Sequence, residues 1–328
     1  MALTYLPFPG KTLQVEDGVK YAYIHIAASP SKPTFLLLHG YPSSSYDWRY
    51  QIPYLKERGY GVLVPDLLGY GDTDKPTELV RYKKKNMAAD LRQILDHEKL
   101  AKVIGVGHDW GAGMLSGLAN YCQDRLSGLV FVSVPYVEPG PFNLDAVNAR
   151  DEQAFGYPTH GYWEFHNEDD AHEVIGRNIE SSTSLYFPAD GATWKTNLGP
   201  VGAAKAWITS NTITPLPSWL SESEAAIHNE ILGKGGFAGP LNWYKAAMRH
   251  INEEDDAKIP EEHIVQKAPS LIVVSDGDYV TRAETAYHTA PKWLRNHEIK
   301  KFKGCGHWIQ LEKRDELSEA LVEFAAKF

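Results

Sequence analysis

The feature that most constrains the fold is a glycine-rich turn, VGHDWGAG, at residues 106–113. The apolar run at 103–107 predicts a buried strand before this turn, and the segment 111–121 predicts a helix after it. The Gly-x-X-x-Gly spacing is typical of a sharp strand-to-helix elbow that lifts its central side chain above the end of a sheet. Serine is the usual central residue, whereas this chain has Asp109. The turn therefore predicts a carboxylate as the nucleophile.

Strand-like and helix-like runs alternate on both sides of this elbow. We expect strands at 12–17, 21–27, 34–40, 60–66, 103–107, 129–135, 270–276 and 296–302, and helices at 48–56, 87–97, 111–121 and 314–327. This alternation is typical of an α/β fold in which helices cover both faces of a mostly parallel sheet.

The sequence between residues 136 and 249 breaks the alternation. Its segments GYPTHGYWEFHNEDD, LYFPADGATWK and PLPSWLSESEAA are rich in aromatic, Pro, Gly and polar residues and lack strand periodicity. This composition indicates a helical insertion and not a further piece of sheet. We therefore expect an α/β core of 1–135 and 250–328 and a helical lid of 136–249. The acidic run at 253–256 is expected to be a solvated connection back to the core.

Charge and composition argue against several classes of partner. The 328 residues carry a formal net charge of -9, which disfavours binding to nucleic acid or to an anionic membrane. No apolar run approaches the roughly 20 residues of a membrane span, and the N-terminal segment lacks the pattern of a secretory signal. Only two cysteines are present, which suits a reducing compartment, and we expect a cytoplasmic protein. We expect it to be a monomer or a homodimer. No His or Cys cluster has metal-ligand spacing, so we expect neither a metal nor another cofactor.

Candidate partners for Asp109 follow other predicted strands. Asp278 comes after the strand at 270–276, and His307 lies in the loop GCGHW after the strand at 296–302. The chain order nucleophile, acid, histidine is that of the α/β-hydrolase fold. The motif HGYP at 39–42 offers the Tyr41 backbone N–H, which together with that of Trp110 is expected to form an oxyanion hole. A cis bond before the proline of this motif is compatible with the sequence.

These motifs identify a family resemblance. HGYP, GHDWGA, SDGDYV and GCGHW closely resemble the corresponding motifs of epoxide hydrolases of the α/β-hydrolase fold, over nearly the whole chain and including the position of the lid. The resemblance implies a small hydrophobic epoxide and water as reactants. It also implies two lid tyrosines that hydrogen-bond the epoxide oxygen. One maps to Tyr244 in LNWYKAAMR, and the other maps to Tyr162 in GYWEFHNEDD, with Tyr157 as its rival.

An aspartate nucleophile suits attack on saturated carbon. Its carboxylate is ionised at neutral pH and can open an epoxide to give an alkyl ester of Asp109. His307, oriented by Asp278, would then activate the water that hydrolyses this ester. The phenols of Tyr162 and Tyr244 would donate to the developing alkoxide. We expect substrate contacts from the following side chains: His39, Pro42, Trp110, Trp163 and Trp308.

Two other functions compete with this interpretation. A haloalkane dehalogenase would use the same Asp109 ester and hold halide with Trp110 and a second donor, but Tyr41 stands where that family commonly has Asn. Trp163 could supply the second donor. A non-catalytic ligand-binding protein would have lost its serine, although Asp278 and His307 remain in place. Histidines such as His39 beside catalytic loops are more often structural, and most aromatic residues of the lid, such as Tyr186, are expected to be packing residues.

Overall fold

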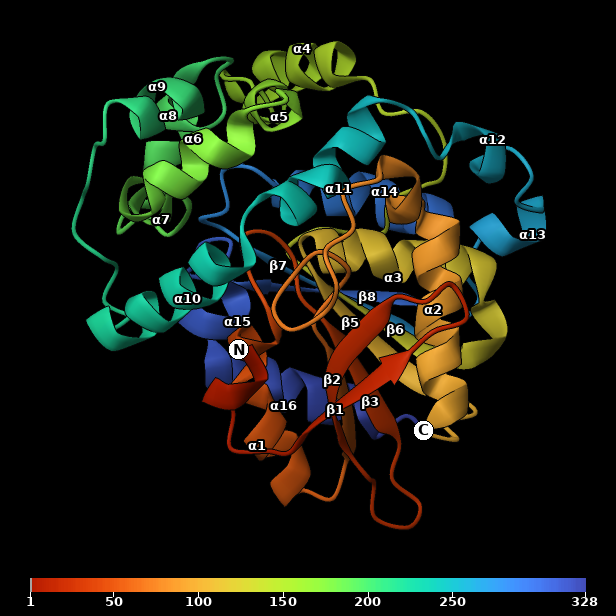
Figure 1. Ribbon diagram of the computed structural model, residues 1–328. Helices are drawn as coiled ribbons and strands as arrows, with labels where there is room; N and C mark the ends of the chain where they lie inside the picture. The colour runs from red at the N-terminus through yellow and green to blue at the C-terminus, as the bar shows by residue number, and fades with distance from the viewer. Residues whose placement is uncertain (1) are drawn as a thin grey trace.

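The fold is built on one eight-stranded sheet. The computed structural model describes residues 2–328. The strands lie in the order β1-β2-β4-β3-β5-β6-β7-β8 (Figure 1). The pairs β1–β2 and β2–β4 are antiparallel, and every pair from β4 to β8 is parallel. Their bounds are β1 Gly10–Gln14, β2 Lys20–Ile26, β3 Thr34–Leu38, β4 Gly61–Pro65, β5 Val103–His108, β6 Leu126–Val132, β7 Ser270–Ser275 and β8 His297–Phe302.

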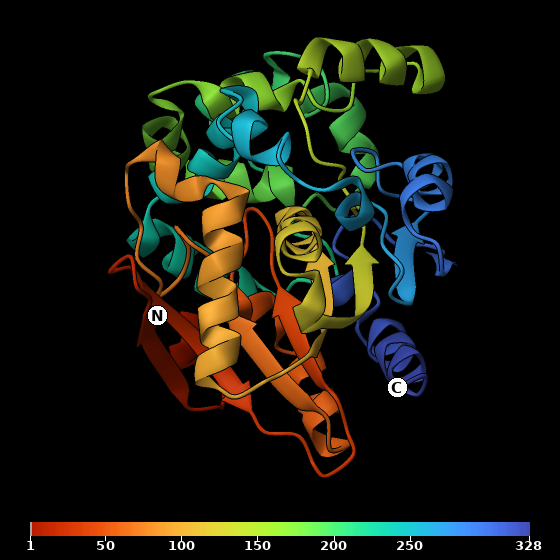
Figure 2. The same cartoon turned by 90° about the vertical axis from the view of Figure 1, so that its right-hand side faces the viewer.

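Helices bury both faces of this sheet, which explains why its central strands are apolar throughout. Along β3, Leu36 and Leu38 belong to a core shared with α2 (Lys84–His97) and α3 (Trp110–Tyr121). The alternate residues Phe35 and Leu37 pack into a second core with α1 (Gln51–Glu57) and α16 (Arg314–Ala325). Figure 2 shows the sheet and its covering helices from the side. The predicted α/β-hydrolase architecture is therefore confirmed.

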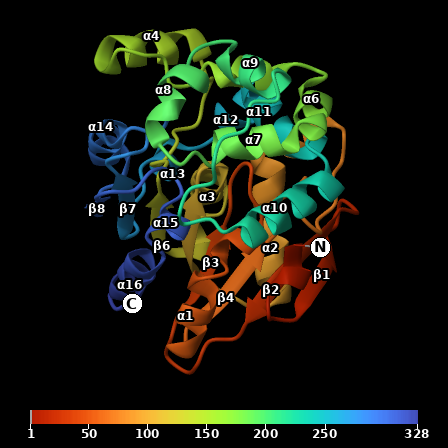
Figure 3. The ribbon, with the colours of Figure 1, turned by 90° about the vertical axis from the view of Figure 1, so that its left-hand side faces the viewer.

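Most of the helices between β6 and β7 form a separate layer above the sheet (Figures 1 and 3). They are α4 Leu144–Phe155, α5 Tyr162–Asn167, α6 Ala171–Arg177, α7 Ile179–Tyr186, α8 Trp194–Asn197, α9 Ala203–Thr209, α10 Glu222–Gly235 and α11 Ala238–Met248, with the short 3-10 helix η5 at Gly191–Thr193. We propose that this layer is the lid, with its limits at 136 and 249. It carries the phenols that face Asp109.

Several local details differ from the sequence-based expectation. The helix expected at 48–56 is divided into a 3-10 helix, η2 (Ser45–Trp48), and α1. A helix between β7 and β8, α14 (Ala283–Trp293), was not expected. The remaining short elements are η1 Ala2–Tyr5, η3 Leu79–Tyr82, η4 Gln123–Arg125, α12 Glu253–Asp256, α13 Glu261–Ile264 and α15 Ile309–Glu312.

The acidic run at 253–256 is not simply a solvated connection, as the sequence had suggested. Its last residue, Asp256, is buried and accepts hydrogen bonds from the Tyr121 hydroxyl at 2.8 Å and from the Gly140 backbone N–H at 3.0 Å. These two contacts join α12 to α3 and to the chain that enters the lid. Among residues 2–328, no helix is both long enough and apolar enough to span a membrane.

Candidate active site

Asp109 occupies a strained position at the elbow between β5 and α3. Its backbone has φ 52° and ψ -123°, a region that non-glycine residues rarely adopt. The flanking glycines make this turn sterically feasible. A Cβ on Gly107 would lie 2.3 Å from the Gly111 carbonyl oxygen, and one on Gly111 would lie 2.1 Å from the Leu38 carbonyl oxygen. The predicted elbow therefore depends on close backbone packing that only glycine permits.

Two backbone donors hold the Asp109 carboxylate. The Tyr41 N–H donates to Asp109 Oδ1 at 2.8 Å, and the Trp110 N–H also hydrogen-bonds the carboxylate. The Tyr41–Pro42 peptide bond is cis, the isomer with which the sequence is compatible. Burial raises the pKa of Asp109, while His307 and these two N–H groups favour its ionised form. Two backbone N–H groups thus donate to the Asp109 carboxylate, and these are the kind of donors that an oxyanion hole requires.

His307 lies between two carboxylates. Its Nδ1 is 2.7 Å from Asp278 Oδ2, and its Nε2 is 3.7 Å from Asp109 Oδ2. Burial alone would lower the pKa of His307, but the charge and hydrogen bond of Asp278, with a contribution from Asp109, raise it overall. The pKa of Asp278 is lowered despite its burial, because it faces His307 and accepts hydrogen bonds from Thr281 and the Val280 N–H. The imidazole is thus oriented with Nε2 toward Asp109.

Groups that sequence reasoning missed fix the loop that carries His307. The Glu312 carboxylate accepts hydrogen bonds from the N–H groups of Gly306 at 2.7 Å and Trp308 at 3.1 Å, the two neighbours of His307. The only hint in the sequence is a glutamate five residues after the histidine, in GHWIQLE. On the other side, the His307 carbonyl oxygen accepts from the Ser133 hydroxyl at 2.6 Å and from His108 Nε2 at 3.0 Å.

Tyr162 begins α5, and Tyr244 lies in α11. Their ring centroids are 6.0 Å apart, and both side chains line a cavity that also reaches Asp109. Burial raises the pKa of both phenols, and the Asp109 charge raises it further, so both stay protonated. Tyr157, the rival of Tyr162, instead donates its hydroxyl to the Tyr279 carbonyl oxygen at 3.1 Å and does not line this cavity. The geometry therefore favours Tyr162.

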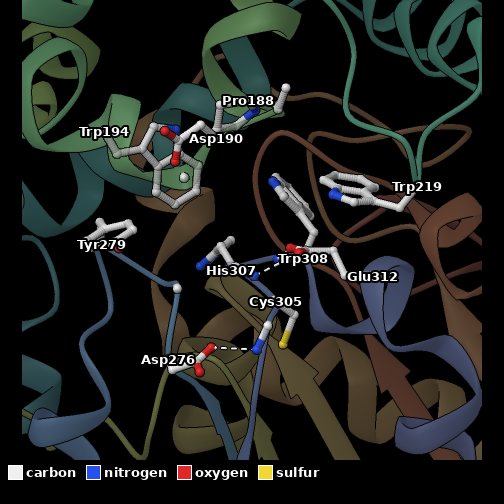
Figure 4. A pocket seen from close by; sticks show the side chains of 15 residues that line it. Pro188, Asp190, Trp194, Trp219, Asp276, Tyr279, Cys305, His307, Trp308 and Glu312 are labelled. Atoms are coloured by element: carbon white, nitrogen blue, oxygen red, sulfur yellow. Dashed lines mark hydrogen bonds between the residues drawn. The ribbon is translucent and has the colours of Figure 1, made fainter.

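We call this space the inner cavity. It has a volume of about 20 Å³, enough for about one water molecule. Its walls are formed by Tyr41, Pro42, Asp109, Tyr162, Tyr186, Trp194, Leu198, Tyr244, Val280, His307 and Trp308. A larger cavity of about 320 Å³, whose lining is drawn in Figure 4, shares Trp194, His307 and Trp308 with the first. His307 therefore borders both the small reaction space and a roomier one.

The five side chains predicted to contact substrate divide into two groups. Pro42 and Trp308 line the inner cavity, whereas His39, Trp110 and Trp163 do not. His39 is buried, with Nε2 accepting from the Leu67 N–H at 3.0 Å and Nδ1 3.1 Å from the Gly40 carbonyl oxygen. Both nitrogens are thus occupied by backbone groups, and we assign His39 a structural role in place of the predicted substrate contact.

Trp110 and Trp163 support the cavity wall from behind. Each indole ring lies 5.1 Å from the Tyr244 ring in an edge-to-face arrangement, and the two indoles are 5.2 Å apart. Such contacts fix the plane of an aromatic ring and add to its burial. These tryptophans therefore set the position of Tyr244, and the structure does not place them against the reacting space.

Comparison with known proteins agrees with this geometry. The alpha/beta hydrolase fold family matches residues 33–314. Epoxide hydrolase A of Mycobacterium tuberculosis is 30% identical over 324 residues, which cover 96% of this chain and 97% of that protein. The chain belongs to the epoxide hydrolases of the α/β-hydrolase fold. The resemblance predicted from its four motifs is therefore confirmed.

Solved structures of this family share the whole architecture. Epoxide hydrolase A from Mycobacterium thermoresistibile superposes with a TM-score of 0.77 at 27% identity, covering 96% of this chain and 98% of that one. An epoxide hydrolase from Vigna radiata has a TM-score of 0.79 at 25% identity, with 98% of both chains covered. The bifunctional epoxide hydrolase 2 of Sus scrofa is 26% identical over 310 residues, and the present chain spans only 54% of the length of that protein.

Proposed function

We propose that this chain converts an epoxide and water to a vicinal diol through a covalent ester on Asp109. The observation that carries the proposal is the meeting of four groups at one water-sized cavity: Asp109, His307 and the phenols of Tyr162 and Tyr244. A carboxylate nucleophile paired with two protonated phenols suits a leaving group that departs as an alkoxide. The names of the relatives, all epoxide hydrolases, support an epoxide as the substrate.

In the first step, Asp109 Oδ2 attacks one of the two carbons of the epoxide ring. We choose Oδ2 because Oδ1 accepts the Tyr41 N–H, whereas Oδ2 lies 3.7 Å from His307 Nε2. A C–O bond forms to Oδ2 as the epoxide C–O bond breaks, and the electron pair of the broken bond goes to the epoxide oxygen. Tyr162 and Tyr244 donate to that oxygen, and one of them supplies the proton that makes it a hydroxyl. The product is a hydroxyalkyl ester of Asp109.

In the second step, His307 Nε2 takes a proton from a water that attacks the ester carbonyl carbon. The negative charge of the tetrahedral intermediate falls on Oδ1, which accepts the Tyr41 N–H, and the Trp110 N–H is a second donor to the same carboxyl group. Collapse breaks the bond between the carbonyl carbon and Oδ2, and the first proton of the water passes from His307 to the departing diol oxygen. The second proton of the water, left on the Asp109 carboxyl group, returns to the tyrosine that protonated the epoxide oxygen, so that carboxylate and phenol are both regenerated. Asp278 stabilises the imidazolium that exists in between.

A single turnover in ¹⁸O-labelled water tests this mechanism. With enzyme in excess over styrene oxide, we expect the label in Asp109 and unlabelled oxygen in the first diol, because Oδ2 leaves with the product. Label in the first diol would show direct attack by water and would refute the ester. Asp109→Ala should be inactive in the same assay.

A parallel assay of haloalkanes decides between epoxide and halide as the leaving group. We expect diol from styrene oxide and no halide release from a haloalkane of similar size. Halide release without diol formation would assign the chain to dehalogenation, which uses the same Asp109 ester and which the labelling experiment therefore does not separate.

A further inference from the structure

The inner cavity has a second polar wall beside the two phenols that face Asp109. It consists of Tyr41, Tyr186 and His166. Tyr41 and Tyr186 line the cavity, with ring centroids 5.5 Å apart. The Tyr186 hydroxyl lies 2.6 Å from His166 Nε2. The sequence had assigned Tyr186 to packing, because nothing in its neighbourhood shows which side chains it meets in the folded lid.

The hydrogen-bonding capacity of this wall is only partly used. His166 Nδ1 is buried without a hydrogen bond among residues 2–328, and the Tyr41 hydroxyl has the Tyr186 hydroxyl as its polar neighbour. Tyr41 and His166 are only 4% and 0% exposed, respectively. Burial lowers the pKa of His166 to about 3, so the ring is neutral. A buried polar atom left unpaired costs folding free energy comparable to a lost hydrogen bond. Of these residues, Tyr41 and Tyr186 line the inner cavity, so their phenols are the polar groups of this wall that a ligand in the cavity can meet.

The wall adjoins the groups that handle the epoxide oxygen. The Tyr41 ring centroid is 5.2 Å from that of Tyr244, and the His166 ring centroid is 4.4 Å from it. His166 also follows Tyr162 by one turn of α5, with ring centroids 5.1 Å apart. An epoxide held by Tyr162 and Tyr244 therefore has its nearest substituent close to Tyr41 and Tyr186.

We propose that Tyr41 and the Tyr186–His166 pair form a subsite for a neutral hydroxyl group on the carbon next to the epoxide ring, so that small epoxy alcohols are the preferred substrates. The inference rests on the proposed epoxide hydrolysis. A hydroxyl both donates and accepts, which matches phenols and a neutral imidazole. An anionic substituent is disfavoured, because no Lys or Arg lines the inner cavity and the Asp109 carboxylate does.

The size of the cavity restricts the substituent. With a volume of about 20 Å³, the inner cavity must expand even for a three-carbon epoxide, and each further atom requires more displacement of its aromatic walls. A single hydroxymethyl group reaches the polar wall with the least expansion. The subsite is thus fitted to a short polar arm and not to an extended one.

Glycidol and 1,2-epoxybutane make a matched pair of probes, since they differ only by a hydroxyl in place of a methyl group. We expect the wild-type kcat/KM, normalised to uncatalysed hydrolysis, to be at least about tenfold higher for glycidol, because a site built for a hydroxyl rejects its apolar analogue. In Tyr186→Phe and in Tyr41→Phe, the glycidol-to-epoxybutane ratio should fall about tenfold, the loss expected for one hydrogen bond.

Tyr70→Phe is the control. The Tyr70 hydroxyl is also buried and unpaired, but Tyr70 does not line the inner cavity, so its loss should leave the ratio unchanged. An unchanged ratio in Tyr186→Phe, or an equal loss with both epoxides, would overturn the subsite and leave the three residues as packing. Equal wild-type kcat/KM values would also overturn it, without depending on how any variant folds. If the wild type hydrolyses neither epoxide, the proposed function itself fails.

Discussion

Replacing Asp278 by Asn should slow hydrolysis of the Asp109 ester so strongly that the ester accumulates on the protein. Asp278 is 1% exposed and accepts the N–H groups of Val280 and Thr281 on Oδ1, both at 2.9 Å. Its Oδ2 meets His307 Nδ1 at 2.7 Å and accepts the Thr281 hydroxyl. Asparagine keeps Oδ1 for the two backbone donors, which places its NH₂ group against His307 Nδ1. The substitution therefore exchanges an acceptor for a donor at one defined atom.

This exchange reverses the tautomer of His307. An NH₂ group at 2.7 Å requires Nδ1 to accept, so the ring proton moves to Nε2, the atom that must take a proton from water. In serine proteases, the corresponding Asp-to-Asn substitution leaves the catalytic histidine in the wrong tautomer and lowers turnover about 10⁴-fold. This loss corresponds to an increase of about 5.5 kcal/mol in the activation free energy. Attack by Asp109 on the epoxide needs no base, so alkylation should slow far less than ester hydrolysis.

Intact-protein mass spectrometry checks this prediction. After mixing Asp278→Asn with styrene oxide, the protein should gain the mass of one epoxide and hold it, and peptide mapping should place the adduct on Asp109. Asp276→Asn is the matched control, because Asp276 Oδ1 accepts the Gly304 N–H at 2.8 Å and an amide oxygen can do the same. Wild-type turnover by Asp278→Asn, or a loss of activity with no adduct, would refute the assignment of roles.

Three further predictions concern alkylation, pH and stability. Tyr244→Phe and Tyr162→Phe should each slow alkylation about 10²-fold and leave ester hydrolysis nearly unchanged in single-turnover experiments, since each removes one donor to the alkoxide. Ester hydrolysis requires neutral His307, whose pKa is raised, so its rate should fall as the pH drops through that pKa, and a rate independent of pH would contradict the role. Burial raises the pKa of Asp90 to about 6, so the folded state binds its proton more tightly than the unfolded state, and stability is lost as pH rises from about 4 to 6. Asp90→Asn should therefore raise the unfolding free energy at pH 7 by up to about 3 kcal/mol, with no gain at pH 4, in denaturant titrations.

The parts of the site that sequence could predict are those fixed by local geometry and chain order. The elbow follows from the glycines around Asp109, since only they allow the turn to pack against β3. The positions of Asp278 and His307 follow from parallel strands, because such strands end at one edge of the sheet and their loops meet there. The sequence could thus predict both the sheet and the convergence of these residues without any knowledge of side-chain packing.

What sequence could not predict depends on contacts between distant segments. Tyr186 looks like any aromatic residue of a helical insertion, and only the fold of the lid brings it beside Tyr41. Glu312 looks like a surface acid, yet it holds the loop of His307. His39 lies in a motif shared with catalytic residues, but its two nitrogens bond to backbone groups. Burial and partner choice decide the role in each case, and neither is encoded in local periodicity.

The charges around His307 connect the two steps of the proposed mechanism. Before reaction, the imidazole lies between the carboxylates of Asp278 and Asp109, and both favour its protonated form. Ester formation neutralises Asp109, so one of the two charges that raise the pKa of His307 disappears when a base is first needed. The loss of this charge lowers the pKa of His307, while Asp278, which contributes more, stays in place to orient the ring. Alkylation of Asp109 thus favours the neutral form of His307, and neutral His307 is the base that hydrolyses the ester and regenerates Asp109.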